Sequence, residues 1–422
     1  MMAFPQLASL GTAVSLLSCC LGLAAQTTPA EQPSPWQVTA TLAEGINTNV
    51  LMALQKPHAD STSSLQLDLG RSWRGPTWSF IATYHPQAMD FARNRRLDYI
   101  AQTYNQAWQL SLGPHTQMSW TFDFNRYPER GGAPQAAGGG VAGVAIASQA
   151  LGLQSVLQSA DTTVSLTHQY SLRGSWNAGI TGAQQSFTPD LRLLGSLPAG
   201  TLAPPRSRTS SGAGNLGWDY ELVPGRRLRL SGEDSELWFS NPAQRMRYDY
   251  VQASISQDLG AGVVLQIGAG PSWNSVLQSA ALQKQLPGVS YAGNASLITQ
   301  QGNTTYGITW QHSEQAGLVP GGVATDNVAM QYGLTWGRGW NASASLGEGR
   351  FAGVSSTPGT ASQGQDSVFA AANLGWKISS GWMLVANANW MSQTLPVAPG
   401  TLGRFRKLQA SLGVSYTPEG LH

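Results

Sequence analysis

The chain has little charge, few lysines and almost no cysteine. Only 11% of its 422 residues are Asp, Glu, Lys or Arg, against about 25% in ordinary soluble domains. Its polarity comes from Ser, Thr, Asn, Gln and 48 Gly instead, and its mean hydropathy is −0.17. The net charge of +2 indicates neither a nucleic acid nor an acidic surface as partner. The 15 Trp argue against disorder, and the composition is typical of strands that line a wet lumen.

The two cysteines, Cys19 and Cys20, lie in an apolar N-terminal run of small residues. This run predicts a secretory signal peptide over residues 1–25, followed by a Pro-rich periplasmic tether over residues 26–35. Removal of the signal leaves no cysteine and therefore excludes a disulfide framework. The stretch Leu16-Leu17-Ser18-Cys19 also resembles a lipoprotein cleavage box, so lipidation of Cys19 stays open.

Long apolar runs and a sustained helical period are also missing, so the sequence predicts neither spanning helices nor amphipathic ones. A period of two is present instead. In the last stretch one face carries Leu408, Ala410, Leu412, Val414 and Tyr416, and the other Lys407, Gln409, Ser411, Gly413 and Ser415. Because successive strand side chains point to opposite faces, such a strand separates an apolar environment from water.

Tight turns separate similar strands along nearly the whole chain. Gly and Pro mark them at 74–76, 113–115, 172–174, 223–225, 260–262, 301–303, 337–339 and 379–381. Longer connections are expected around 43–62, 87–96, 128–160, 188–207, 276–287, 315–325, 353–365 and 395–404.

Short turns on one rim and long loops on the other predict a transmembrane antiparallel up-and-down β-barrel over residues 36–418, with a tail at 419–422. We expect about 18 strands, within a range of 16 to 20, short periplasmic turns and long outer loops. A soluble propeller or β-helix is the alternative, and the repeated motif that either requires is absent from the sequence.

Tryptophans gather near the short turns and predict an aromatic girdle at the inner membrane interface. The expected members are Trp78, Trp176, Trp336, Trp340, Trp376 and Trp382. Trp390 lies eight positions beyond Trp382 on the same face. At about 3.3 Å per residue and a tilt near 40°, the two are roughly 20 Å apart along the membrane normal, close to the expected apolar band.

Two local features carry a resemblance to known proteins. The segment Gly45-Ile46-Asn47-Thr48-Asn49-Val50 resembles the Asn-rich opening of bacterial outer-membrane β-barrel proteins of the porin type, and Gly413 with Tyr416 resembles their final-strand assembly signal. The chain departs from that signal because Thr417 to His422 follow the aromatic residue. Over residues 36–418 the resemblance implies an outer-membrane location in a Gram-negative-type envelope. It also implies outer-membrane lipid, lipopolysaccharide and the barrel-assembly machinery as partners, and leaves the oligomeric state open.

Alternation places a set of polar residues on the expected luminal face, namely Arg227, Arg229, Asp219, Glu221, Asp123, Asn125, Asn387, Asn389 and Lys407. The arginines of the 223–225 hairpin either favour anions or form cross-strand ion pairs with Asp219 and Glu221. In the uncharged connection 128–160, a segment with Val141, Val144 and Ile146 either folds inward as a constriction or forms a flexible loop. Arginines near the loop bases, Arg93, Arg95, Arg96, Arg245 and Arg247, are candidates for contact with lipopolysaccharide phosphates.

Catalysis finds little support. The six His show no metal-ligand spacing, and no cofactor or nucleophile motif is recognisable. His168 falls on the expected lipid face, where outer-membrane phospholipases hold a His–Ser pair, but no accompanying Ser motif is recognisable. We therefore interpret the chain as a non-enzymatic pore for passive diffusion of small polar solutes. The alternatives are a non-conducting structural or polysaccharide-export barrel and, third, a barrel lipase.

Overall fold

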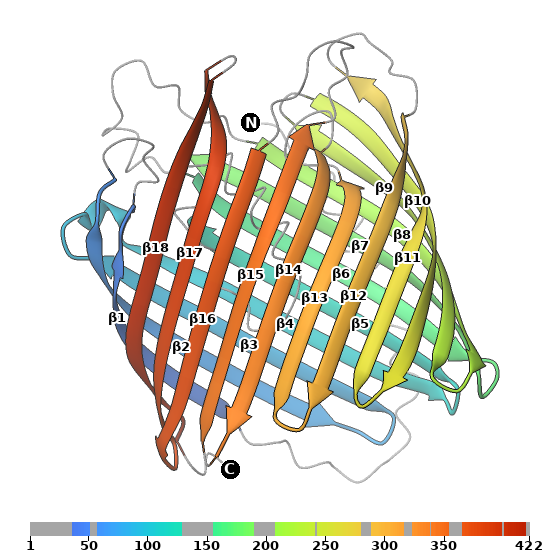
Figure 1. Ribbon diagram of the computed structural model, residues 1–422, viewed down its shortest axis with the longest axis horizontal. Helices are drawn as coiled ribbons and strands as arrows, with labels where there is room; N and C mark the ends of the chain where they lie inside the picture. Colours follow the sequence, from blue (N-terminus) through green and yellow to red (C-terminus); the bar gives the residue numbers. More distant parts are fainter. Residues whose placement is uncertain are drawn as a thin grey trace, which may run out of the picture.

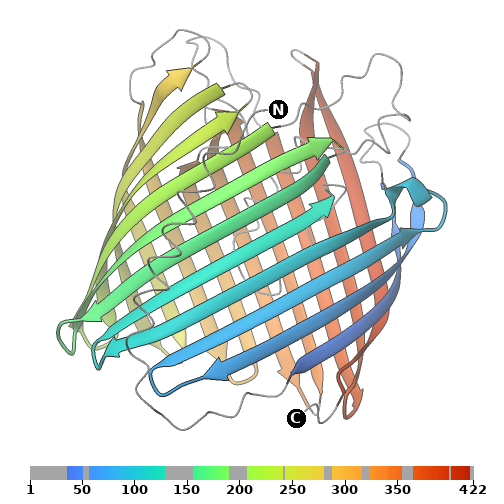
Figure 2. The same cartoon turned by 180° about the vertical axis from the view of Figure 1, so that it is seen from behind.

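The computed structural model describes residues 36–50, 57–128, 155–189, 207–240, 243–279, 288–315, 323–337, 339–353, 365–398 and 401–418. These residues form one closed antiparallel sheet of 18 strands (Figures 1 and 2). The expected all-β up-and-down barrel and its strand number are therefore confirmed. The elements are β1 (Gln37–Asn47), β2 (Asp60–Arg74), β3 (Trp78–Phe91), the 3₁₀ turn η1 (Arg95–Leu97), β4 (Tyr99–Gly113), β5 (Thr116–Pro128), β6 (Ser155–Gln169), β7 (Gly174–Pro189), β8 (Ser207–Val223), β9 (Arg226–Ser240), β10 (Ala243–Gly260), β11 (Val263–Ser279), β12 (Gly288–Gln301), β13 (Thr304–Gln315), β14 (Val323–Trp336), β15 (Trp340–Gly353), β16 (Gln365–Ser379), β17 (Trp382–Ala398) and β18 (Thr401–Tyr416).

The barrel closes where β18 pairs with β1, from Ala40 opposite Tyr416 to Asn47 opposite Gln409. In Figure 1 the blue β1 runs beside the red β18. A Cβ added to Gly413 would lie 2.5 Å from the carbonyl oxygen of Leu42 and 2.6 Å from the Cβ of Ala43. The expected assembly-signal glycine thus sits where β1 and β18 approach too closely for a side chain.

The two faces of the sheet differ as the alternation predicts. On β18, Leu412 is 56% exposed, whereas Ser415 is 5% exposed and Lys407 4%. Register partners on neighbouring strands share a face. By this criterion, large exposed apolar side chains of the neighbouring strands lie on the same face as Leu412. That face is the convex exterior of the barrel, and the polar face lines the lumen.

Some connections differ from expectation. Around 395–404 the chain is mostly strand, because β17 continues to Ala398 and β18 starts at Thr401. Pro396 fits at the end of β17, opposite Leu402, where loss of a backbone donor is tolerated. Likewise β3 continues to Phe91, so its connection to β4 is shorter than predicted, and only residues 241–242 separate β9 from β10.

Part of the outer mouth is ordered by one buried carboxylate. Asp60 accepts hydrogen bonds from the backbone nitrogens of Arg93 (3.1 Å) and Asn94 (2.9 Å) and from Asn94 Nδ2 (2.7 Å). Beside it, Val50, Phe91 and Leu97 form a buried apolar cluster. This cluster and Asp60 fix the β3–β4 connection against the first hairpin.

Within the described residues, no helix is long and apolar enough to cross a membrane.

Candidate functional site: the luminal wall

The hairpin of β8 and β9 brings the predicted charged residues together. Arg227 lies opposite Glu221 and Arg229 opposite Asp219, all on the luminal face. The Nε atom of Arg229 is 3.9 Å from Oδ1 of Asp219. Arg229 is therefore paired with a carboxylate that offsets much of its field in the lumen, and Arg227 has Glu221 opposite it in register.

We name the luminal face of β5–β9 the acidic wall. It carries three carboxylates that lie farther from the inner turns than the β8–β9 arginines do. Asp123 on β5 is the register partner of Asp161 on β6, next to the pair Asn125 and Ser159. Glu233 on β9 accepts a hydrogen bond of 3.2 Å from the Tyr250 hydroxyl. Among the described residues, neither Asp123, Asp161 nor Glu233 forms an ion pair with a basic group. This acidic wall thus retains net negative charge.

The luminal face of β11–β18, which we name the neutral wall, carries amides and hydroxyls instead. Asn387 lies opposite Ser411, and Asn389 opposite Gln409. On this wall the described strands hold only two charged luminal side chains, Lys377 beside an inner turn and Lys407 near the outer end. A solute passing the middle of this wall meets neutral hydrogen-bonding groups.

One luminal pair was not anticipated from the sequence. His85 Nδ1 lies 2.6 Å from Oδ1 of Asp68, and the same oxygen accepts a 2.8 Å hydrogen bond from Gln66 Nε2. These side chains are 17 positions apart along the chain, so only the β2–β3 register brings them together. Asp161 and Glu233 were also missed, although each follows the luminal period of its strand.

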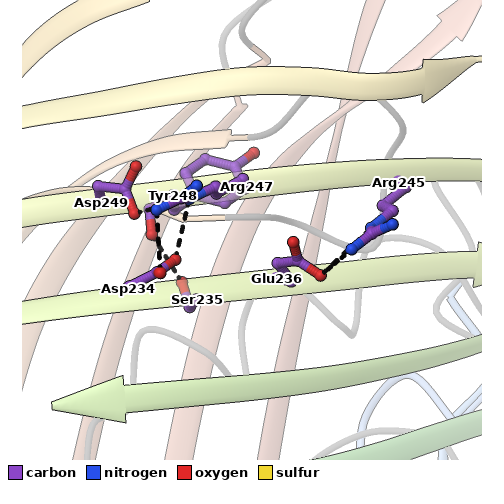
Figure 3. A network of polar contacts seen from close by, with 7 residues as sticks. All are labelled: Asp234, Ser235, Glu236, Arg245, Arg247, Tyr248 and Asp249. Carbon is purple, nitrogen blue, oxygen red and sulfur yellow. Dashed lines mark hydrogen bonds and ion pairs between the residues drawn. The ribbon is translucent and has the colours of Figure 1, made fainter.

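Two of the arginines near the loop bases, Arg245 and Arg247, form ion pairs with carboxylates of the protein (Figure 3). Arg245 Nη2 lies 2.6 Å from Glu236 Oε2, and Arg247 contacts both Asp234 (3.0 Å) and Asp249 (3.1 Å). Arg93, Arg95 and Arg96 are exposed on the β3–β4 connection. The predicted constriction residues Val141, Val144 and Ile146 lie outside the described residues, as do residues 1–35 and 419–422.

The predicted girdle tryptophans lie on the outer face beside the inner turns. Rings of Trp336 and Trp340 stack at 5.5 Å, and those of Trp340 and Trp376 at 5.1 Å, while Trp382 contacts Tyr416 at 4.6 Å. Trp78 and Trp176 likewise meet aromatic rings on neighbouring strands, which are Trp108 and His168. His168 also lies within 2.9 Å of the Thr116 hydroxyl.

An exterior of apolar side chains, a polar lumen and a fully paired ring of strands define a transmembrane β-barrel of the outer-membrane type. The protein is thus located in the outer membrane. Over the residues described, no group of three or more His, Cys, Asp and Glu is placed to hold a metal ion.

Comparison with known families gave no matching family model. No curated protein matched the sequence either. Similar solved structures include the FrpB iron transporter from Neisseria meningitidis, with 7% identity, a TM-score of 0.48, and coverage of 92% of this chain and 82% of that one. A mutant of the ferric enterobactin receptor PfeA from Pseudomonas aeruginosa has 8% identity, a TM-score of 0.46 and coverage of 93% and 81%. The siderophore receptor PirA from Acinetobacter baumannii has 7% identity, a TM-score of 0.44 and coverage of 93% and 81%.

Proposed function

We propose that the protein is a pore for passive diffusion of small polar solutes. The supporting observation is the neutral wall, whose Asn, Gln, Ser and Thr side chains offer donors and acceptors without a tightly binding charge. Solutes enter such a wall because it replaces some of their hydration, and leave because each contact is weak. The polar groups of the acidic wall line another part of the lumen.

Conductance of the purified, folded barrel in planar bilayers tests this proposal. We expect stepwise current increments, each from the insertion of one pore. Folding is checked independently by heat-modifiable mobility on electrophoresis. A folded barrel that inserts without current steps would instead support the non-conducting structural or export role.

We also propose that the protein is not an enzyme. His168, the residue that suggested a lipase, contacts Thr116 and the Trp176 ring, an arrangement that suits an interfacial side chain. Phospholipid hydrolysis by the purified barrel that disappears in His168→Ala would contradict this. Equal, background-level hydrolysis by both proteins is the expected result.

A further inference from the structure

The membrane face of β7–β10 carries an unusual group of charges. Arg247 bridges Asp234 and Asp249, and Arg245 pairs with Glu236 (Figure 3). Two strand positions farther along β10 on the same face is Val251, which is exposed like the other membrane-facing apolar residues. The five charged side chains therefore point out of the barrel and not into its lumen.

Two tryptophans give the depth of this network. Trp238 on β9 is the register partner of Arg245, and Trp273 on β11 is the partner of Asp249. Both rings are exposed on the membrane face. Since Trp concentrates at membrane interfaces, the network lies at the outer edge of the apolar band, where a charge facing lipid costs only about 0–1 kcal/mol.

Beside the network, on β7 and β8, the same face carries glycines and protruding apolar side chains, and Gly212 and Gly214 are the register partners of Glu236 and Asp234. Gly182 and Gly212 are register partners, and a Cβ added to nearby Gly214 would meet nothing within 4 Å. Ile180, the register partner of Gly214, is 65% exposed, and Leu216, two positions beyond Gly214 on β8, is 62% exposed. Glycine weakens a strand interior and often marks a place where another backbone approaches closely.

We propose that the face of β7–β10 docks a second copy of this chain in the membrane. A two-fold axis along the membrane normal sets the same patch of both copies face to face at equal depth. The protruding Ile180 and Leu216 of one copy then pack against the glycines of the other, where Gly214 faces open space. Because the patch holds both charge signs, Arg247 of one copy also meets a carboxylate of the other.

Lipid alone is a poorer occupant of this surface. Acyl chains can cover the glycines, but they form no polar contact with the charged network beside them. A lipopolysaccharide phosphate attracts the two arginines but is repelled by the three carboxylates, Asp234, Glu236 and Asp249. A second copy satisfies both parts of the patch, and this proposal does not depend on the pore function.

Site-specific cross-linking in intact outer membranes tests the interface. The only cysteines of the sequence are Cys19 and Cys20, so a wild-type control measures any background. Ile180→Cys, within the proposed interface, is compared with Ala372→Cys, an exposed membrane-face position on β16. With a short, membrane-permeable thiol cross-linker, we expect several-fold more dimer from Ile180→Cys. Equal yields at both positions, or no dimer from folded Ile180→Cys, would overturn the proposal.

Charge variants then test the network in the Ile180→Cys background. Arg247→Glu should lower the dimer yield several-fold, because it places carboxylates against carboxylates. Exchange of the pair, Arg247→Asp with Asp234→Arg, should restore it. Unchanged dimer yield in Arg247→Glu would exclude a role for the charges. Loss of co-purified lipopolysaccharide, with no dimer in any variant, would assign the face to lipid.

Discussion

The acidic wall and the neutral wall enclose the same lumen with different chemistry. On β5–β9, Asp123, Asp161 and Glu233 present negative charge. On β11–β18, the amides of Asn387 and Asn389 occupy the corresponding luminal positions, and charge is confined to the two ends of the wall. In the proposed pore, this difference assigns charge selection and solute contact to separate sides of the lumen.

In the proposed pore, this difference creates an electric field directed across the lumen. Cations should be drawn toward β5–β9 and anions toward the amides. We therefore expect the pore to prefer cations, although the net charge of the whole chain is +2. In the proposed pore, the local placement of carboxylates should decide ion selectivity, because the aqueous lumen screens charges beyond about 10 Å at 0.1 M salt.

The largest effect should come from disrupting the pairing of β18 with β1, which closes the barrel and which we call the seam. Gly413→Val places a side chain against the Leu42 carbonyl and Ala43, so strands must separate. We expect a loss of about 2 kcal/mol, or about thirtyfold in the folded-to-unfolded ratio, measured by urea titration of Trp fluorescence.

Gly217→Val on the acidic wall is the matched control. A Cβ at Gly217 would meet the side chain of Asn177, which can rotate away, and not backbone. This variant should lose much less stability. Equal losses from both glycines would show that the seam is no tighter than the rest of the barrel.

The second effect concerns the acidic wall itself. Asp123→Asn, Asp161→Asn and Glu233→Gln together should lower the potassium-to-chloride permeability ratio about tenfold at low salt. One charge about 8 Å from an ion in water contributes about 0.5 kcal/mol, or about twofold, and three multiply. Reversal potentials across a salt gradient measure this. An unchanged reversal potential would contradict cation selection by this wall.

A smaller effect should follow when the neutral wall is made acidic. Asn387→Asp adds one carboxylate without changing the side-chain size and should raise the same permeability ratio about twofold. Asn387→Gln, which adds no charge, should leave it unchanged. If Asn387→Asp has no effect, ions do not pass near this wall.

The smallest effect is expected for the paired charges. Because Arg229 and Asp219 lie 3.9 Å apart, their fields largely cancel in the lumen. Arg229→Gln combined with Asp219→Asn should change the permeability ratio by well under twofold. The two single variants, Arg229→Gln and Asp219→Asn, should shift the reversal potential in opposite directions. This checks that the pair is within reach of permeating ions.

The fold was predictable because the alternation of apolar and polar residues within each strand shows which of its faces meets lipid and which meets water. On β18, alternation from Lys407 to Tyr416 identifies both faces without any knowledge of partners. Strand ends were less predictable. Pro396 indicated a loop, yet it remains in β17 because a strand end needs no donor there.

Contacts between luminal residues were predictable only where the two residues are neighbours across one short turn. Arg229 and Asp219 flank the Pro224-Gly225 turn, so their pairing follows from the hairpin. Asp123 and Asp161 are separated by a long connection whose length does not reveal which residues face each other. Their proximity depends on the register of β5 and β6, which alternation alone leaves open.

The contact between β1 and β18 also has a consequence for timing. The hydroxyls of Thr39 and Thr417, 2.8 Å apart, are separated by 378 positions along the chain. Bringing such distant segments together costs about 5 kcal/mol of chain entropy if no intervening hairpin has formed. We therefore expect closure to be the last step of folding. Until then, β1 and β18 each expose an unpaired edge, so the speed of that single step decides between a barrel and an aggregate.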